Sequence, residues 1–218
     1  QGKMTTLGGM RNTNTYSTSG ENAAFARMGQ TWGKPAVGFV KVNGKRVMVN
    51  FLPGGYDTGY ESATYKPTAA KPAQGNAVYM VKVGEEKANT DKVLVTDTDS
   101  DSGRLLWWAS YGSGKDHTNN YTTRSTNLQK SEHQDMFNSI VNEIRTVDRD
   151  YDGLTDHIYF ADLGGRVWRA DINNPKYKDK NGKDTGTFRV DRVVKVLDVS
   201  DQKSTDDAPP RIYERPLF

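Results

Sequence analysis

The stretch PAVGFVKVNGKRVMVNF, residues 35–51, indicates the fold class of this chain. Branched and aromatic residues stand on both sides of the pair Asn43-Gly44, which predicts two short antiparallel strands. Asn-Gly favours a two-residue hairpin turn because both turn positions need a positive φ. We therefore expect a β-hairpin here, and we expect the segments that follow to extend it into a sheet.

Further strands are predicted along the chain by runs of branched and aromatic residues. They are GNAVYMVKV (75–83), GRLLWWAS (103–110), NEIRTV (142–147), HIYFAD (157–162), RVWRADI (166–172) and FRVDRVVKVLDV (188–199). Polar or glycine-rich segments separate them. We expect residues 1–30 to be a lead-in that is mostly loop, 111–136 an insertion loop with room for a short helix, and 201–218 a linker into a further, truncated blade.

A weak internal repeat organises these strands. Residues 75–83, GNAVYMVKV, align with residues 164–172, GGRVWRADI, and the upstream segments VNFLPGG (49–55) and YFADLGG (159–165) both end in Gly-Gly. Each copy predicts four antiparallel strands, which is typical of propeller blades. We predict an all-β fold, a modified β-propeller with quinoprotein-like blades, of which this chain holds about two to three four-stranded ones. The first blade or blades would span 31–110 and the second 137–200, and Trp32, Trp107, Trp108 and Trp168 would pack between blades.

Composition excludes several classes of function. The 218 residues carry 30 basic and 27 acidic side chains, a net charge of +3, and no basic run that would indicate nucleic-acid binding. The absence of cysteine excludes disulfides, thiolate metal sites and cysteine nucleophiles. No apolar run approaches the roughly 20 residues that span a bilayer. Because the chain begins at Gln1, we expect it to be a piece of a longer protein.

The connection between the first two strands of the second copy is DRDYDGLTD, residues 148–156, where the first copy has only Asn43-Gly44. Hairpin geometry does not require four aspartates. Calcium does favour them, because it takes six to eight oxygen ligands in flexible geometry. Side chains at loop positions 1, 3 and 5 can converge if Gly153 lets the chain curl. The predicted calcium ligands are Asp148, Asp150, Asp152, the carbonyl of Leu154, and Asp156.

The acidic loop also has a simpler interpretation, and two other segments resemble it. The nine residues could form a solvated acidic turn without an ion. DTDSDSGRL (97–105) has aspartates at positions 1, 3 and 5 but Leu105 at position 9, so it lacks the closing carboxylate and reads as a polar turn. DKNGKDTG (179–186) reads as an Asn-Gly turn. The three histidines show no zinc-binding spacing, and we expect His157 to be a strand residue.

Several segments together resemble a known family. GQTWGKPAVG, LPGGYDTGYE, GNAVYMV followed by GRLLWWAS, and VDRDYDGLTDHIYFADLGGRVWRADI occur in that order from about Gly29 onward. They resemble the C-terminal domain of PilY-type proteins, which are type IV pilus biogenesis factors and tip adhesins. The last segment is the most specific, because it combines the acidic loop with the following Gly-Gly and Trp168. The family domain is longer, so an adhesive site in its missing N-terminal region does not transfer.

The resemblance implies a modified β-propeller with one calcium in the nine-residue loop, held by the ligands named above. It implies a non-enzymatic protein at the pilus tip or cell surface, or in the outer membrane or periplasm during assembly. Its partners would be pilins or other tip and assembly components, and a host or abiotic surface. Metal occupancy would regulate pilus extension against retraction, and so twitching motility and surface adhesion.

Two alternative functions stay open at this point. A PQQ-dependent dehydrogenase has similar blade motifs and a calcium-assisted cofactor, although its carboxylates would come from several blades and not from one loop. A surface-recognition propeller of the integrin type carries similar loops with structural calcium. The single acidic loop counts against that class, which repeats the loop in several blades.

Overall fold

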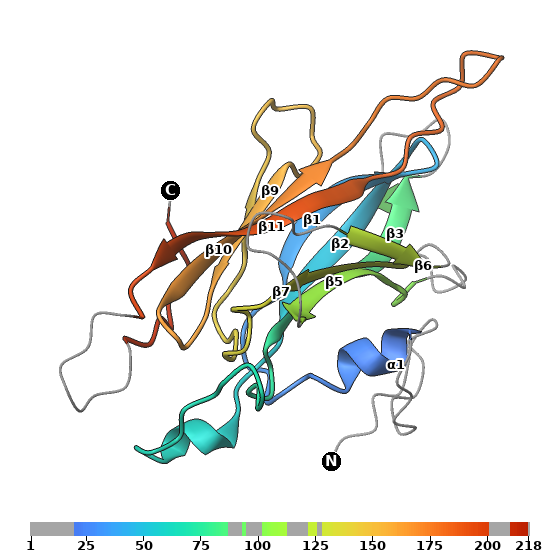
Figure 1. The fold of residues 1–218 in the computed structure, drawn as a ribbon. Helices are drawn as coiled ribbons and strands as arrows, with labels where there is room; N and C mark the ends of the chain where they lie inside the picture. Colours follow the sequence, from blue (N-terminus) through green and yellow to red (C-terminus); the bar gives the residue numbers. More distant parts are fainter. Residues whose placement is uncertain are drawn as a thin grey trace.

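Two β-sheets form the framework of the computed structural model, which describes residues 20–86, 93–94, 102–112, 122–125, 128–200 and 210–217 (Figure 1). The elements in chain order are α1 (Gly20–Phe25), β1 (Ala36–Val42), β2 (Lys45–Pro53), the 3₁₀ turn η1 (Thr58–Glu61), β3 (Ala77–Glu86), β4 (Val93–Leu94), β5 (Leu105–Tyr111), β6 (Thr122–Ser125), β7 (Leu128–His133), β8 (Arg145–Val147), β9 (His157–Ala161), β10 (Arg166–Asn173) and β11 (Arg189–Asp198). The predicted all-β fold is confirmed.

The strand order reproduces the two units of the sequence repeat. The larger sheet runs β1-β2-β3-β5-β7-β6, with β4 paired to β3, and the smaller runs β11-β10-β9-β8. Strands β1, β2, β3 and β5 pair antiparallel in series, as do β8 to β11. The repeated Val-aromatic pair lies in the third strand of each unit, at Tyr79 in β3 and Trp168 in β10. Neither sheet closes on itself through the described strands.

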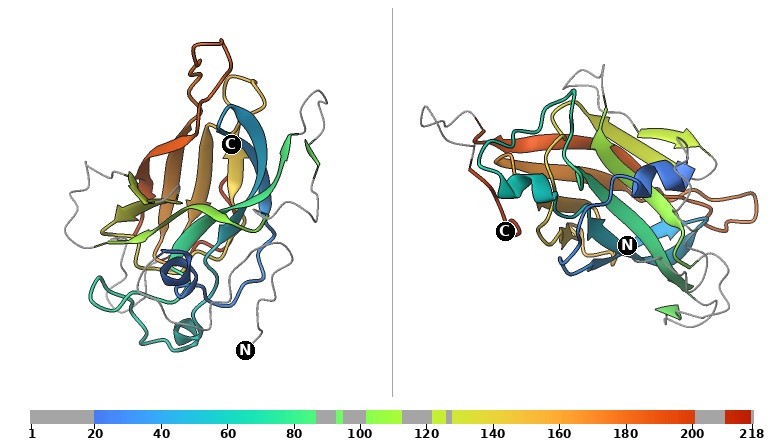
Figure 2. Two further views of the ribbon diagram at one scale, coloured as in Figure 1. Left: turned by 90° about the vertical axis from the view of Figure 1, so that its right-hand side faces the viewer. Right: turned by 90° about the horizontal axis from the view of Figure 1, so that it is seen from below.

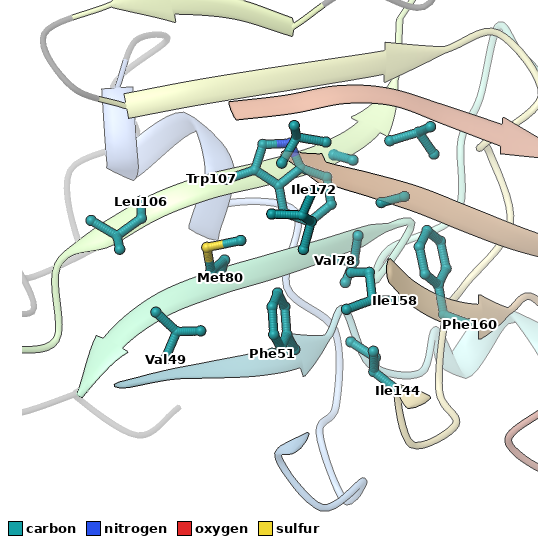
Figure 3. Packing of buried hydrophobic residues seen from close by; sticks show 14 of the residues in the cluster. Val49, Phe51, Val78, Met80, Leu106, Trp107, Ile144, Ile158, Phe160 and Ile172 are labelled. Atoms are coloured by element: carbon teal, nitrogen blue, oxygen red, sulfur yellow. The ribbon is translucent and has the colours of Figure 1, made fainter. Parts of the chain in front are cut away.

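The core lies between the two sheets, whose inner faces pack together (Figure 3). In β2, Val47, Val49 and Phe51 are buried while the residues between them are half-buried, the period of two expected of a strand with one face on a core. The smaller sheet and the segment before it contribute Ile144, Ile158, Phe160 and Ile172. The apolar surface removed from water here is the main stabilising contribution to the two-layer arrangement.

The outer face of the larger sheet is covered in part by α1, which lies across β3 and β5 (Figures 1 and 2). Phe25 stacks on Tyr79 with ring centroids 5.4 Å apart, and the Tyr79 hydroxyl donates to the carbonyl of Ala24 at 2.9 Å. Burial raises the pKa of Tyr79 above its ordinary value, so this hydroxyl keeps its proton and remains a donor. Strands β3 and β5 are thus buried on both faces, which explains their continuous apolar runs.

The prediction of an insertion loop at 111–136 is wrong for residues 122–125 and 128–133, which form β6 and β7. Residues 113–121 and 126–127 of this range lie outside the described residues. β7 adds to the larger sheet parallel to β5, and its alternate residues Gln129, Ser131 and His133 are buried. These buried residues are polar, so the segment lacks the apolar alternation that marks a strand. The side chain of Gln129 reaches the second sheet. Its Nε2 donates to the carbonyl of Phe188 at 2.9 Å, and its Oε1 accepts from the backbone amide of Val190 at 3.1 Å.

Three smaller predictions are corrected or placed by the structure. The lead-in contains the short helix α1, while residues 1–19 lie outside the described residues. Trp107 and Trp168 lie in the core between the sheets, whereas Trp108 is buried on the outer face with α1. Trp32 is 66% exposed and stacks on Tyr56. Residues 210–217 form no strand; Arg211 of this segment donates to the carbonyl of Tyr60 at 3.1 Å. Among described residues, no helix is long and apolar enough to cross a membrane.

Candidate metal centre

The acidic loop 148–156 connects β8 to β9, the position that Asn43-Gly44 occupies between β1 and β2. Asn43 and Gly44 have φ values of 52° and 76°, as the predicted two-residue turn requires. At the base of the longer loop, the amide of Asp156 donates to the carbonyl of Val147 at 2.9 Å. The prediction that this loop replaces a hairpin turn is therefore confirmed.

Three of the four predicted carboxylates converge. One oxygen from each of Asp148, Asp150 and Asp156 lies within 4.8 Å of the others. Each carboxylate also holds the backbone of the loop: Asp148 accepts from the amide of Gly153 at 2.8 Å, Asp150 from that of Asp152 at 3.3 Å, and Asp156 from that of Arg149 at 2.6 Å. These internal bonds keep the three carboxylates together although their charges repel.

One carboxylate oxygen of Asp148 is poorly satisfied. Asp148 Oδ1 is shielded from solvent and has no hydrogen-bond partner among the described residues, while Asp148 Oδ2 is occupied by Gly153. A buried carboxylate oxygen without a partner is costly, and a bound cation would remove that cost. The donor set is made of hard oxygens alone, which suits calcium. The residues present therefore fit the predicted ion.

The remaining two predicted ligands are placed differently. Asp152 is exposed and lies outside the converging group; its Oδ1 accepts from the amide of Leu154 at 2.9 Å. The side chain of Leu154 is buried, 6% exposed. Coordination by Asp152 and by the Leu154 carbonyl stays a prediction.

The curl of the loop depends on two residues with positive φ. Gly153 has a φ of 82°, as predicted for the bend, and Tyr151 has a φ of 61°. A positive φ strains a bulky side chain such as Tyr151 by roughly 1–2 kcal/mol. Tyr151 is 90% exposed, so its ring contributes little packing in return. The contacts within the loop and around it therefore stabilise this conformation against its backbone strain.

The loop is also bound to the other sheet, along a line of contacts that we name the seam. The seam joins Gly153 and Thr155 of the loop to Phe39 and Arg46 of the β1–β2 hairpin, and includes Asn174 after β10. The left view of Figure 2 shows the loop, the β10–β11 connection and the β1–β2 hairpin at the same end of the molecule. Sequence reasoning did not find these residues, because no spacing pattern connects positions more than 100 residues apart.

The other acidic segments and His157 follow the predictions where the structure describes them. Residues 179–186 form a turn in which Asp179 accepts from the amides of Asn181 and Lys183, at 2.8 and 3.0 Å. His157 is the first residue of β9, with its Nδ1 2.9 Å from Asp171. Most of the segment 97–105 lies outside the described residues.

Comparisons of the chain with protein-family models, with curated proteins and with solved structures gave no match. The candidate site therefore rests on the loop, its three converging carboxylates and its contacts with the larger sheet.

Proposed function

We propose that the chain is the calcium-binding part of a type IV pilus biogenesis or tip protein, and that it regulates pilus extension, twitching motility and surface adhesion without being an enzyme. The observation that carries the calcium proposal is the convergence of Asp148, Asp150 and Asp156, together with a buried oxygen of Asp148 that has no hydrogen-bond partner among the described residues. The pilus proposal is supported by the family resemblance of the segments around this loop.

The fold supports the finer proposal of propeller blades. Two antiparallel units of four strands, β1-β2-β3-β5 and β8 to β11, share a sequence repeat and pack face to face, which supports the proposal that they are neighbouring blades. In such a fold the acidic loop would lie on one end of the ring, where loops carry the binding function. We infer a location at the cell surface or pilus tip, with pilins or other tip and assembly components as partners.

Calcium would act on this loop by neutralising its charge. A bound ion would supply positive charge at the point where three carboxylates meet, and the attraction of each carboxylate to the ion would outweigh the repulsion between them. The chain's own residues then hold the shape: Asp148 keeps Gly153 in the bend, and Asp156 keeps the amide of Arg149. A partner that recognises this loop would bind the calcium-loaded form better, and calcium would shift the population toward that form.

Isothermal titration calorimetry with calcium chloride tests the site. The parent chain should bind one calcium, and the Asp148→Ala variant should bind none, because it loses the buried oxygen. Asp191→Ala is the matched control: Asp191 is an exposed aspartate of β11 that contacts Arg189 and lies outside the loop. Absence of binding to the parent, or equal affinity in the Asp148→Ala variant, would contradict the proposed metal site.

The pilus role has a separate test in cells. Replacing the native gene by the Asp148→Ala allele should abolish twitching motility and surface attachment while the protein is still made and exported, and the Asp191→Ala allele should not. Normal motility in the Asp148→Ala strain, with calcium binding lost in calorimetry, would separate the two parts of the proposal. The site would stand and the pilus role would be rejected.

A further inference from the structure

We infer that the seam couples calcium binding to the docking of the two sheets, with Arg46 as the positioning residue of the calcium loop. This inference rests on the proposed calcium site and adds its regulation. Calcium in the loop would strengthen the contact with the β1–β2 hairpin, and the hairpin in turn would raise the affinity for calcium. The hairpin lies on the larger sheet, so the signal would pass from one sheet to the other.

The contact of Arg46 with the loop is specific. Its guanidinium donates through both Nε and Nη2 to the carbonyl of Gly153, at 3.2 and 3.0 Å, and it stacks over the ring of Phe39, 3.8 Å from the centroid. The amide of Gly153 is at the same time held by Asp148 Oδ2. Gly153 is thus fixed on both sides, and Arg46 acts through it on the orientation of the Asp148 carboxylate.

Thr155 provides the second half of the seam. Its amide donates to the carbonyl of Phe39 at 2.7 Å, and its hydroxyl accepts from the amide of Phe39 at 3.2 Å. The carbonyl of Thr155 accepts from the side chain of Asn174 at 3.1 Å, and the same side chain accepts from the amide of Lys41 at 2.9 Å. The outer edge of β1 is therefore hydrogen-bonded to the loop at Phe39 and, through Asn174, at Lys41.

The docking residues lie between two of the proposed ligands, Asp150 and Asp156, along the loop. Asp148, Asp150 and Asp156 converge on the candidate ion site, while Gly153 and Thr155 bond to the hairpin. A change that draws the carboxylates together must move the backbone between them, and that backbone is bonded to the larger sheet. Because coupling of two binding equilibria is reciprocal, weakening the seam must weaken calcium binding by the same factor by which calcium strengthens the seam.

The positive charge of Arg46 has the opposite effect, since a cation near the site repels calcium. Two substitutions separate charge from position. Arg46→Gln removes the charge and the paired donors, whereas Arg46→Lys keeps the charge but loses the planar fork that bonds Gly153 twice. If positioning dominates, both variants bind calcium more weakly. If charge dominates, Arg46→Gln binds calcium more tightly and Arg46→Lys binds it as the parent does.

The experiment measures calcium affinity and hydrogen exchange on the full 218-residue chain. We expect Arg46→Gln and Arg46→Lys to weaken calcium binding by about 5- to 50-fold, the usual range of such coupling. The matched control is Lys45→Gln, which removes one positive charge from the neighbouring residue. Lys45 is exposed and pairs with Glu85 at 2.7 Å. The calcium affinity of this variant should stay within about twofold of the parent, since an exposed, paired charge is screened by solvent and salt.

Hydrogen exchange gives the readout at the hairpin. Calcium should slow exchange of the β1 peptide (residues 36–42) in the parent and in Lys45→Gln, and this protection should be reduced in the Arg46 variants. Thr155→Val removes only the hydroxyl that accepts from the amide of Phe39. It should reduce both the calcium affinity and the protection of β1, and it replaces the Arg46 variants in this test if they do not fold. Two results would overturn the coupling and leave the calcium site intact, provided that the parent binds calcium. One is an unchanged or tighter calcium affinity of Arg46→Gln, and the other is that calcium does not protect β1 from exchange. A parent that binds no calcium would reject both.

Discussion

Replacing Asp150 by Asn should change stability in opposite directions with and without calcium. Asp150 is the most suitable of the three converging residues, because it is exposed and its one internal bond, the Oδ1 that accepts from the amide of Asp152, can be kept by the amide oxygen of Asn. The substitution therefore removes a charge with little change in shape. Without a cation it should relieve repulsion, and with calcium it should remove a ligand.

The magnitude follows from the geometry of the cluster. Oxygens within 4.8 Å of one another repel by about 0.9 kcal/mol per pair at the dielectric of water. Asp150 takes part in two of the three pairs, so its neutralisation should relieve roughly 2 kcal/mol at low salt. At physiological salt the Debye length is about 8 Å, which reduces the gain to roughly 1 kcal/mol. In calcium at 100 times the dissociation constant, the parent should gain about 2.7 kcal/mol that the variant lacks.

Urea unfolding followed by circular dichroism measures both effects. In EDTA, Asp150→Asn should unfold at a higher urea concentration than the parent, by a margin that shrinks as salt is added. In calcium the order should reverse. A variant that is less stable than the parent in EDTA, with the same slope of the unfolding free energy against urea, would refute the repulsion argument. An equal calcium response in the two proteins would refute the ligand role of Asp150.

Two further predictions concern the framework around the site. Burial raises the pKa of Asp162 to about 6, so this carboxyl stabilises the fold below the unfolded pKa of 3.8 and loses that contribution as pH rises through 6. The unfolding free energy of the parent minus that of Asp162→Asn should therefore fall between pH 4 and 7, on the order of 2–3 kcal/mol. If urea unfolding shows no change in this difference with pH, the burial argument is wrong. Gly44 and Gly182 have similar positive φ, but a Cβ on Gly44 would meet the carbonyl of Asp184 at 1.8 Å, whereas one on Gly182 would meet no described atom within 4 Å. Gly182→Ala should thus lower the unfolding free energy by only about 1 kcal/mol, and Gly44→Ala should lower it clearly more, as measured by thermal unfolding. Equal losses in the two variants would show that the hairpin moves freely away from Asp184.

The strands that sequence patterns predicted correctly are those whose order is local. The β1–β2 hairpin follows from alternation and from Asn43-Gly44, and β9, β10 and β11 follow from branched and aromatic runs. The acidic loop was predicted for the same reason: its bend at Gly153 and the spacing of its aspartates are properties of nine consecutive residues. Convergence of Asp148, Asp150 and Asp156 needs only that short curl.

Other features depended on partners far away in the chain. The sequence pattern predicts a loop at β7 because Gln129, Ser131 and His133 are polar. These side chains can be buried only where distant groups supply hydrogen-bond partners. Ser131 accepts from the indole of Trp107 at 2.8 Å, and Gln129 bonds β11 some 60 residues later. No local pattern marks a polar residue for burial, since burial is tolerable only once its hydrogen-bond partner is in place.

The sequence by itself determined that this chain is all-β, that its strands form two repeated units, and that one hairpin turn is replaced by an acidic loop. These follow from residue periods and turn chemistry, which act over a few positions. Only the tertiary structure decided which face of each strand is covered, that β7 extends the larger sheet, and that Arg46 and Thr155 attach the loop to that sheet. Arg46 and Gly153 are 107 positions apart, and such a contact exists only after hydrophobic burial has brought the two sheets together.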